Sequence, residues 1–313
     1  MVTSILEKIK AIKSMKFVMG KNNKDLNQFT LKKIHFLHFV LLLLFGCQNY
    51  NDSRLIEEFR VVNSENIPKI SAHRGGKGIK GYPENCLETM DYLHRNIDAL
   101  YEVDISETKD GLLVLMHDNS IDRTTSGSGL VRRKTFSELK EFFLVDDFGE
   151  QTSYRIPLLD EVLTWAKTNN AVLTLDIKKG VELKKVVNAI KKNTAQDHCI
   201  IITYSLEQAL RAYDIAPDLM LSVSARNESE LDALLNSKIP TSNMIAFTGT
   251  RLSQQDLYIK LSDNDILSML GTLGNLDRMA AARGDYLYEQ WRGLGINIIA
   301  TDRPIAVNKI LKQ

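Results

Sequence analysis

Short apolar runs recur along this chain from residue 69 almost to its end, and most are separated by longer stretches with helical spacing of apolar residues. The runs hold many β-branched residues, which is typical of buried strands. Nine are expected as strands: residues 69–72, 100–105, 112–116, 172–177, 199–203, 220–223, 244–247, 266–269 and 297–300. Repeated strand and helix over this length predicts an α/β fold of the (β/α)8 barrel type.

Nine strands are one too many for such a barrel, and the second and third runs explain the surplus. Only residues 106–111 separate them, which is too little chain for a crossover helix. The pair Asp110-Gly111 is typical of a tight turn. We therefore expect a β-hairpin within residues 100–117, centred near Lys109, with Glu102 roughly opposite His117.

A helix is expected directly after residues 83–85. Asn85 and Glu88 are three positions apart, the spacing of a capping box. Met90 and Leu93 then continue an apolar stripe, which packs against a core and does no chemistry.

The N-terminal segment has the character of a targeting signal. Two lysines precede a block of apolar residues at 34–45, which is shorter than the ~20 residues that span a bilayer. A charged start and a short apolar region are typical of an export signal. Residues 44–47 resemble a bacterial lipoprotein signal, in which the cysteine, here Cys47, receives lipid. A buried core helix is the alternative, and translation could begin at Met15 or Met19.

These patterns divide the chain into three parts. Residues 1–46 are expected to be the export signal, 47–66 a polar tether and 67–313 a single domain, because no Pro/Gly/Ser-rich linker follows Pro68. The protein is expected to be exported, periplasmic or at the cell surface, and anchored to the membrane through Cys47.

Charge counts then bear on the partners of the mature chain. Without residues 1–46 it has 32 basic and 37 acidic residues, a net charge of −5. Such a balance argues against nucleic-acid binding, and an anionic substrate would need local cations. Cys86 and Cys199 could form a disulfide, but their apolar surroundings favour small core residues. The oligomeric state stays open.

The candidate catalytic and metal-binding residues are concentrated near the ends of the first strands. Glu102 and Asp104 alternate in a strand, so both carboxylates point to one face. Acids held this close repel one another, and a divalent cation with oxygen ligands would relieve the repulsion. A solvated strand face is the ordinary alternative. His73 and His117 each follow a strand, where a barrel places reacting groups.

Nine short motifs together resemble those of glycerophosphodiester phosphodiesterases. In chain order they are His-Arg-Gly-Gly at 73–76, Pro-Glu-Asn at 83–85, Glu-Val-Asp at 102–104, Thr-Lys-Asp-Gly at 108–111, His-Asp at 117–118, Arg-Thr-Thr at 123–125, Ile-Pro-Leu-Leu at 156–159, Leu-Asp-Ile-Lys at 175–178 and Thr-Asp-Arg-Pro at 301–304. The resemblance covers residue 70 to the C-terminus. It implies metal-dependent hydrolysis of small glycerophosphodiesters to glycerol 3-phosphate and an alcohol.

The resemblance also implies a role for individual residues. It implies one divalent ion, Ca²⁺ or Mg²⁺, on Glu102, Asp104 and Asp176, an acid/base pair of His73 and His117, and phosphate contacts from Arg74 and Lys178. We expect Glu84, Asn85 and Asp118 to contact these groups and support them, without contacting the metal or the substrate themselves. Asp302 could hydrogen-bond the site or form a turn, and Asp176 with Lys178 could be a simple ion pair.

Two departures from the family pattern concern the metal and the alcohol. Asp176 stands where glutamate is more common, so an ion must lie closer to that strand or be reached through water. Residues 266–272 contain no aromatic side chain to cover the glycerol moiety. Two alternatives stay open: a related barrel that cleaves a choline- or inositol-bearing phosphodiester, and a surface protein that binds without turnover.

Overall fold

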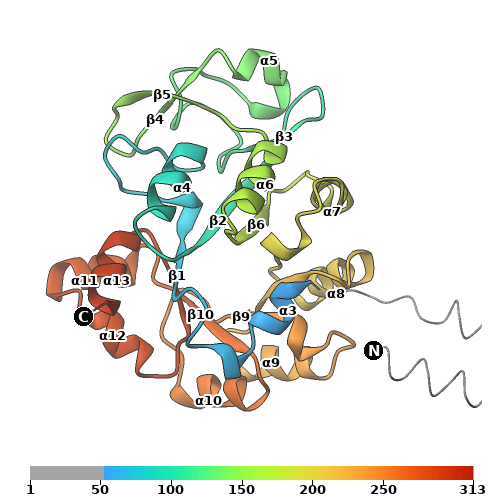
Figure 1. The fold of residues 1–313 in the computed structure, drawn as a ribbon, viewed down its shortest axis with the longest axis vertical. Coiled ribbons are helices and arrows are strands. Elements are labelled where there is room, and N and C mark those ends of the chain that lie inside the picture. The colour runs from blue at the N-terminus through green and yellow to red at the C-terminus, as the bar shows by residue number, and fades with distance from the viewer. Residues whose placement is uncertain (1–52, 313) are drawn as a thin grey trace, which may run out of the picture. The chain divides into compact units, whose positions relative to one another are not determined.

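The computed structural model describes residues 53–312, and an eight-stranded parallel barrel forms their centre (Figure 1). The barrel strands are β1 (Ile70–Ala72), β2 (Leu100–Glu107), β6 (Leu173–Ile177), β7 (Cys199–Ile202), β8 (Met220–Ser224), β9 (Met244–Phe247), β10 (Leu267–Gly271) and β11 (Ile298–Thr301). Each pairs in parallel with its neighbours, and β1 pairs with both β2 and β11, which closes the ring. The predicted fold class is confirmed.

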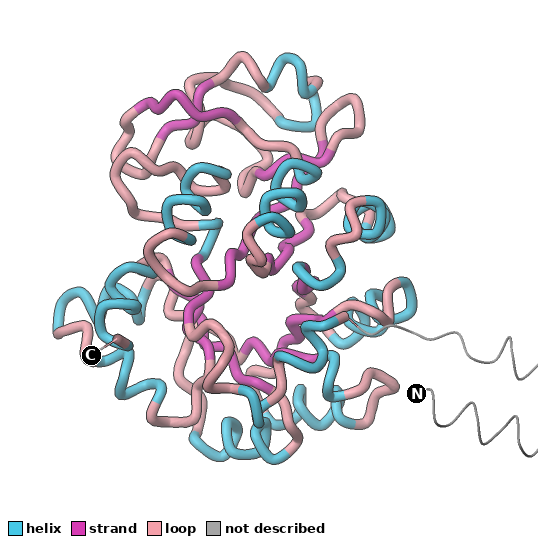
Figure 2. The backbone as a smooth tube through the Cα atoms, in the orientation of Figure 1, coloured by secondary structure: helices cyan, strands magenta, loops and turns pink. Residues whose placement is uncertain are grey.

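Helices lie outside the strands, as Figure 2 shows in cyan around magenta. They are α3 (Arg54–Glu58), α4 (Leu87–His94), α5 (Phe136–Leu139), α6 (Leu159–Thr168), α7 (Leu183–Lys192), α8 (Leu206–Ile215), α9 (Glu228–Leu235), α10 (Gln255–Asp263), α11 (Asn275–Arg283), α12 (Leu287–Arg292) and α13 (Pro304–Leu311). No helix between residues 53 and 312 has the length and apolar character needed to cross a bilayer. The predicted export signal and Cys47 lie outside the described residues.

Alternate strand residues divide between two apolar layers, as the period of two requires. One layer fills the barrel interior with side chains such as Ile200, Met220 and Ile298. Leu55 and Phe59, from α3 and the residue after it, belong to this same buried cluster. The segment expected as a polar tether therefore includes residues of the barrel core.

The predicted hairpin is present, with its register shifted by one residue. β3 (Leu113–Leu115) pairs antiparallel with β2, and Ile105 faces Leu115. The turn is thus centred at Asp110, and Gly111 adopts a left-handed φ of 80° that favours glycine. The centre of the hairpin thus lies one residue beyond the expected Lys109, and the paired residues of β2 are 105–107, which do not include Glu102.

A second hairpin was not predicted. β4 (Phe143–Val145) pairs with β5 (Gln151–Arg155), separately from the barrel sheet. The residues of β5 are mostly polar and at least partly exposed, so their sequence lacks the apolar run that marked the barrel strands. With α5, this hairpin lies beyond one end of α4 and α6 in Figure 1.

The expected helix cap at Asn85 is wrong. Cys86 is the N-cap residue of α4 and makes no side-chain cap bond. Asn85 instead has a left-handed φ of 51°, and its side chain bonds to Asp104. Cys86 and Cys199 are free and buried, as their apolar surroundings indicated.

Candidate active site

A cavity of about 240 Å³ lies where the strands end at their carboxyl termini. Its charged lining residues are His73, Glu102, Asp104, His117, Asp176 and Lys178. The fold therefore brings together six of the seven residues expected to bind metal, transfer protons or contact phosphate. The seventh, Arg74, lies beside them, with its guanidinium 2.8 Å from His117 Nε2.

The three acids come from two neighbouring strands. β2 and β6 pair so that Asp104 faces Asp176, and Glu102 lies two residues before Asp104 on the same face. One oxygen of each carboxylate lies within 4.8 Å of the others. Asp104 is 1% exposed. Three oxygen ligands at this spacing fit a hard divalent cation such as Ca²⁺ or Mg²⁺.

Lys178 is the cation closest to these acids in the structure. Its Nζ lies 2.6 Å from Asp104 Oδ1 and 2.7 Å from Asp176 Oδ2. Burial alone would raise the pKa of Asp104, but the Lys178 ammonium holds it below its usual value. Burial, and then the charge of Asp104, raise the pKa of Glu102 well above its usual value. One ammonium therefore does not compensate three acids, and a further positive charge would be stabilised here.

His73 follows β1 and is held by a carboxylate from the far end of the chain. Its Nδ1 lies 2.6 Å from Oδ1 of Asp302, which follows β11. The other ring nitrogen, Nε2, lies 3.9 Å from Glu102 Oε2. The Asp302 backbone is itself fixed, because its N–H donates to Asp277 at 2.8 Å. The imidazole is thus oriented with Nε2 toward the acids.

His117 is likewise held by a carboxylate, in this case from the next residue in the chain. Its Nδ1 lies 2.7 Å from Asp118 Oδ1, and Arg123 Nε donates to the other oxygen of Asp118 at 2.7 Å. The hydrogen bond from Arg123 lowers the pKa of Asp118 to about 2. Because the Arg74 guanidinium can only donate, His117 Nε2 accepts its hydrogen bond, which places the imidazole proton on Nδ1.

Arg74 connects the two histidines through an unusual backbone conformation. Its φ is 55°, a left-handed value that costs a non-glycine residue ~1–2 kcal/mol. In this conformation its N–H donates to Glu102 Oε2 at 2.7 Å. At Gly76, which follows in the same turn, an added Cβ would lie 2.6 Å from Leu93, so only glycine lets the turn pack on α4.

The residues expected behind the site do contact its charged groups. Glu84, 3% exposed, accepts hydrogen bonds from Arg74 at 2.9 Å and Arg123 at 2.7 Å. Asn85 donates to Asp104 Oδ2 at 2.7 Å and accepts from the Asp104 N–H at 3.0 Å. These bonds fix the positions of Arg74 and Asp104.

Sequence reasoning missed some residues of the site. From the sequence, no role is assigned to Arg123, although this residue begins the Arg-Thr-Thr motif. For Asp302 the sequence leaves two roles open, a hydrogen bond to the site and a turn. Tyr204, which follows β7, also lines the cavity. Nothing in the local sequence marks Tyr204, because it follows a buried strand like any loop residue.

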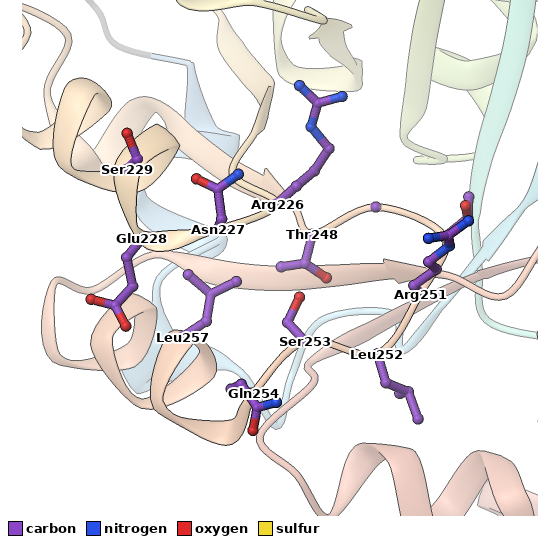
Figure 3. A pocket seen from close by; sticks show the side chains of 12 residues that line it. Arg226, Asn227, Glu228, Ser229, Thr248, Arg251, Leu252, Ser253, Gln254 and Leu257 are labelled. Carbon is purple, nitrogen blue, oxygen red and sulfur yellow. The ribbon is translucent and has the colours of Figure 1, made fainter.

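Two larger cavities lie outside the acid cluster. One, of about 770 Å³, lies between the loops after β8 and β9 (Figure 3). Its Arg226 is paired with Glu230 at 2.6 Å, and it contains none of the predicted site residues. The other, of about 610 Å³, adjoins the acid cluster at Lys178.

Comparison with known proteins connects this geometry to a family. The model of the glycerophosphoryl diester phosphodiesterase family matches residues 73–280. A glycerophosphodiester phosphodiesterase of Bacillus altitudinis is 33% identical over 166 residues, which cover 50% of this chain and 66% of that protein. The chain thus spans just under two thirds of this curated relative.

Solved structures agree with the fold. The crystal structure of a glycerophosphoryl diester phosphodiesterase from Parabacteroides distasonis is 32% identical, with a TM-score of 0.77 over 82% of this chain and 90% of that one. An Oleispira antarctica phosphodiesterase in complex with its product sn-glycerol-3-phosphate has a TM-score of 0.64 at 18% identity, over 80% and 98% of the two chains. At that identity the likeness concerns the fold alone.

Proposed function

This chain belongs to the glycerophosphoryl diester phosphodiesterase family, and we propose that it hydrolyses glycerophosphodiesters to glycerol 3-phosphate and an alcohol. One observation carries the proposal. His73 and His117 each have a carboxylate at Nδ1, and both rings line the cavity that contains the three acids.

The two imidazoles meet the proton requirements of the reaction. Hydrolysis of a phosphodiester needs a nucleophile that loses a proton and a leaving oxygen that gains one. We assign one transfer to His73 and the other to His117. Asp302 and Asp118 would stabilise whichever ring becomes positively charged. The nucleophile is either water or the neighbouring glycerol hydroxyl, which would give a cyclic product first.

The acid cluster fits one divalent ion, Ca²⁺ or Mg²⁺. Glu102, Asp104 and Asp176 would hold it, because their three oxygens lie within 4.8 Å of one another. Such an ion, when bound, neutralises phosphate charge and lowers the pKa of a hydroxyl or water. The short Asp176 is compatible with this, since its strand lies directly beside the strand of the other two acids.

Arg74 and Lys178 supply positive charge for the substrate phosphate. The guanidinium of Arg74 lies within 3.1 Å of Glu84 and 2.8 Å of His117, so its direction is fixed before substrate arrives. A planar guanidinium forks onto two phosphate oxygens, whereas the Lys178 ammonium acts as a point charge.

The test is hydrolysis of glycerophosphocholine by the purified chain, followed by phosphorus NMR. We expect glycerol 3-phosphate as the final product, no turnover in excess chelator, and recovery on adding Ca²⁺ or Mg²⁺. Unchanged turnover in chelator would contradict the proposed metal site. A stable cyclic phosphate, or phosphocholine, would instead identify a phospholipase-type reaction.

We further propose that the protein is exported and anchored to a membrane through a lipid on Cys47. The signal-like pattern of residues 34–47 supports this. Metabolic labelling with a fatty acid should mark the wild-type protein and not Cys47→Ala. Equal labelling of both would exclude lipid attachment at Cys47.

A further inference from the structure

The stretch from Ser53 to Pro68 crosses the amino-terminal ends of the barrel strands and closes that end of the ring. Its apolar side chains Leu55, Phe59 and Ile67 are 5% exposed or less. They belong to one buried cluster with residues that lie at the start of a barrel strand or within one position of it: Leu100, Val172, Ile200, Met220, Ile245, Leu267 and Ile298. The packing of this cluster fixes the stretch against the amino end of the barrel.

Hydrogen bonds fix the point at which the chain enters this end. The Ser53 N–H donates to the Asp218 carbonyl at 3.3 Å, and the Ser53 hydroxyl donates to the Gln196 carbonyl at 3.1 Å. Asp218 precedes β8 and Gln196 precedes β7. Further along, the Val61 N–H donates at 2.9 Å to Asp265, which precedes β10. The described chain therefore begins at the amino ends of the strands.

The catalytic cavity lies at the other end of the same strands. His73 and Asp302 each directly follow a strand, and Asp176 is the last residue but one of β6. The barrel therefore separates the cavity from Ser53. The helices α7 and α8, which end close to the partners of Ser53, have 10 residues each, so they are ~15 Å long and ~10 Å thick.

Only residues 48–52 lie between Ser53 and Cys47, the proposed site of lipid attachment. From Cys47 to Ser53, even a fully extended chain spans at most ~22 Å. To bring the cavity to the bilayer, this length of chain would have to pass outwards over a helix ~10 Å thick and then along ~15 Å of it, in addition to the loops at both ends. It is too short for that path, but it is long enough to hold the amino end of the barrel against the membrane.

The surface of the amino end is compatible with lipid contact. Val62, next to the bonded Val61, is 85% exposed, more than any other large apolar side chain in residues 53–312. Residues 53–69 contain as many basic as acidic side chains, namely Arg54, Arg60 and Lys69 against Glu57, Glu58 and Glu65. Because the stretch has no net charge, anionic head groups do not repel it, and Val62 can enter the interface between head groups and acyl chains.

We propose that the amino end of the barrel faces the membrane that holds the Cys47 lipid, and that the catalytic cavity opens away from this membrane. The inference rests on the proposed lipid anchor and on the proposed hydrolysis, whose substrates it narrows. They are glycerophosphodiesters that diffuse in water, because a phosphodiester embedded in the same membrane lies against the closed end of the barrel.

Fluorescence quenching on vesicles locates the two ends. The lipidated protein is labelled at Val62→Cys or, in a second sample, at Leu252→Cys, an exposed position in the loop after β9 at the cavity end. Cys86 and Cys199 are buried and stay unlabelled. With a quencher attached to the lipids, we expect severalfold stronger quenching at position 62 than at position 252. Equal quenching, or stronger quenching at position 252, would overturn the proposed orientation.

The matched control lengthens the tether. An insertion of about twenty Gly/Ser residues after Asp52 adds up to ~70 Å of reach, so the barrel is free to turn. The difference in quenching between the two positions should then shrink severalfold. If the difference stayed as large as with the natural tether, the argument from tether length would be wrong.

Two further measurements separate this proposal from those on which it rests. If fatty-acid labelling fails at Cys47, the anchor is wrong and the orientation falls with it. If the anchor is present, quenching decides the orientation whether or not the protein hydrolyses glycerophosphocholine. Where it does, KM should be the same on vesicles and in detergent, because the cavity faces water in both. A severalfold higher KM on vesicles would contradict the orientation.

Discussion

The two halves of the catalytic cavity wall differ sharply in chemistry. The half formed around β1, β2 and β6 contains the histidines, the acids and Lys178. The half around β8 to β11 contributes Ser222, Ser224, Phe247, Met269 and Ala300. Every charged group that lines this cavity therefore lies on one side.

The difference also extends to how firmly the side chains are held. On the charged side, Asp104 is bonded to both Asn85 and Lys178, and each histidine is bonded to a carboxylate. On the opposite side, Ser224 makes only a long hydrogen bond of 3.4 Å to Thr203. We infer that the charged side determines the reaction, and that the other side contacts the variable part of the substrate.

The largest effect is expected from the histidines. His73→Ala or His117→Ala should lower kcat by ~10²–10⁴-fold, because each removes a proton-transfer group. Steady-state kinetics measure this, with circular dichroism to confirm folding. His198→Gln is the matched control, since His198 bonds only to a backbone carbonyl at Ala171 and should keep normal kcat. An active His73→Ala/His117→Ala double mutant would end the assignment.

A smaller loss is expected from the carboxylate that orients His73. Asp302→Asn keeps the shape but removes the negative charge at 2.6 Å from Nδ1, and kcat should fall by about 10–100-fold. KM should change little, because Asp302 acts through the ring. A purely structural role would instead lower the melting temperature and leave kcat per folded molecule unchanged.

Substitution on the opposite side should change selectivity and leave the reaction intact. Ser224→Ala is expected to alter kcat/KM by less than about tenfold, and unequally for choline and ethanolamine substrates. Parallel assays on both substrates measure the ratio. If Ser224→Ala lowered kcat as strongly as His73→Ala, the proposed division between the two sides would be wrong.

The smallest effect concerns stability and pH. The pKa of Asp118 is lowered to about 2 in the fold, so its ionised form stabilises the protein above the unfolded pKa near 4. Since the side chain is 32% exposed, we expect Asp118→Asn to cost about 1 kcal/mol at neutral pH, after allowance for solvent screening.

This difference should vanish as pH falls from about 4 to about 2, because the wild-type carboxylate is then protonated as well. Urea unfolding of both proteins at several pH values measures it. A constant difference down to pH 2 would show that the ion pair with Arg123 is not its source.

The sequence was most informative where one strand carries its own signal. The apolar runs located all eight barrel strands, and the alternation of Glu102 and Asp104 placed both on one face. Such features depend on neighbouring residues alone. The polar strand β5 has no such run, so the second hairpin was missed.

Contacts between distant segments could not be derived in the same way. Asn85 was interpreted as a helix cap because capping is a local pattern, yet its side chain bonds to Asp104, 19 positions away. Tyr204 and Asp176 line the same cavity only because β6 and β7 are neighbours in the barrel. These contacts depend on which segments become neighbours in the closed barrel, and patterns within a single segment do not predict that.

The pair of His73 and Asp302 joins residues 229 positions apart. His73 follows the first barrel strand, and Asp302 follows the last, next to α13 at the end of the chain. Because translation proceeds from the N-terminus, Asp302 leaves the ribosome long after His73. A nascent chain consequently holds the His73 imidazole without its carboxylate partner until residue 302 has emerged, so the onset of turnover in a time-resolved translation assay should mark the moment at which the two residues meet.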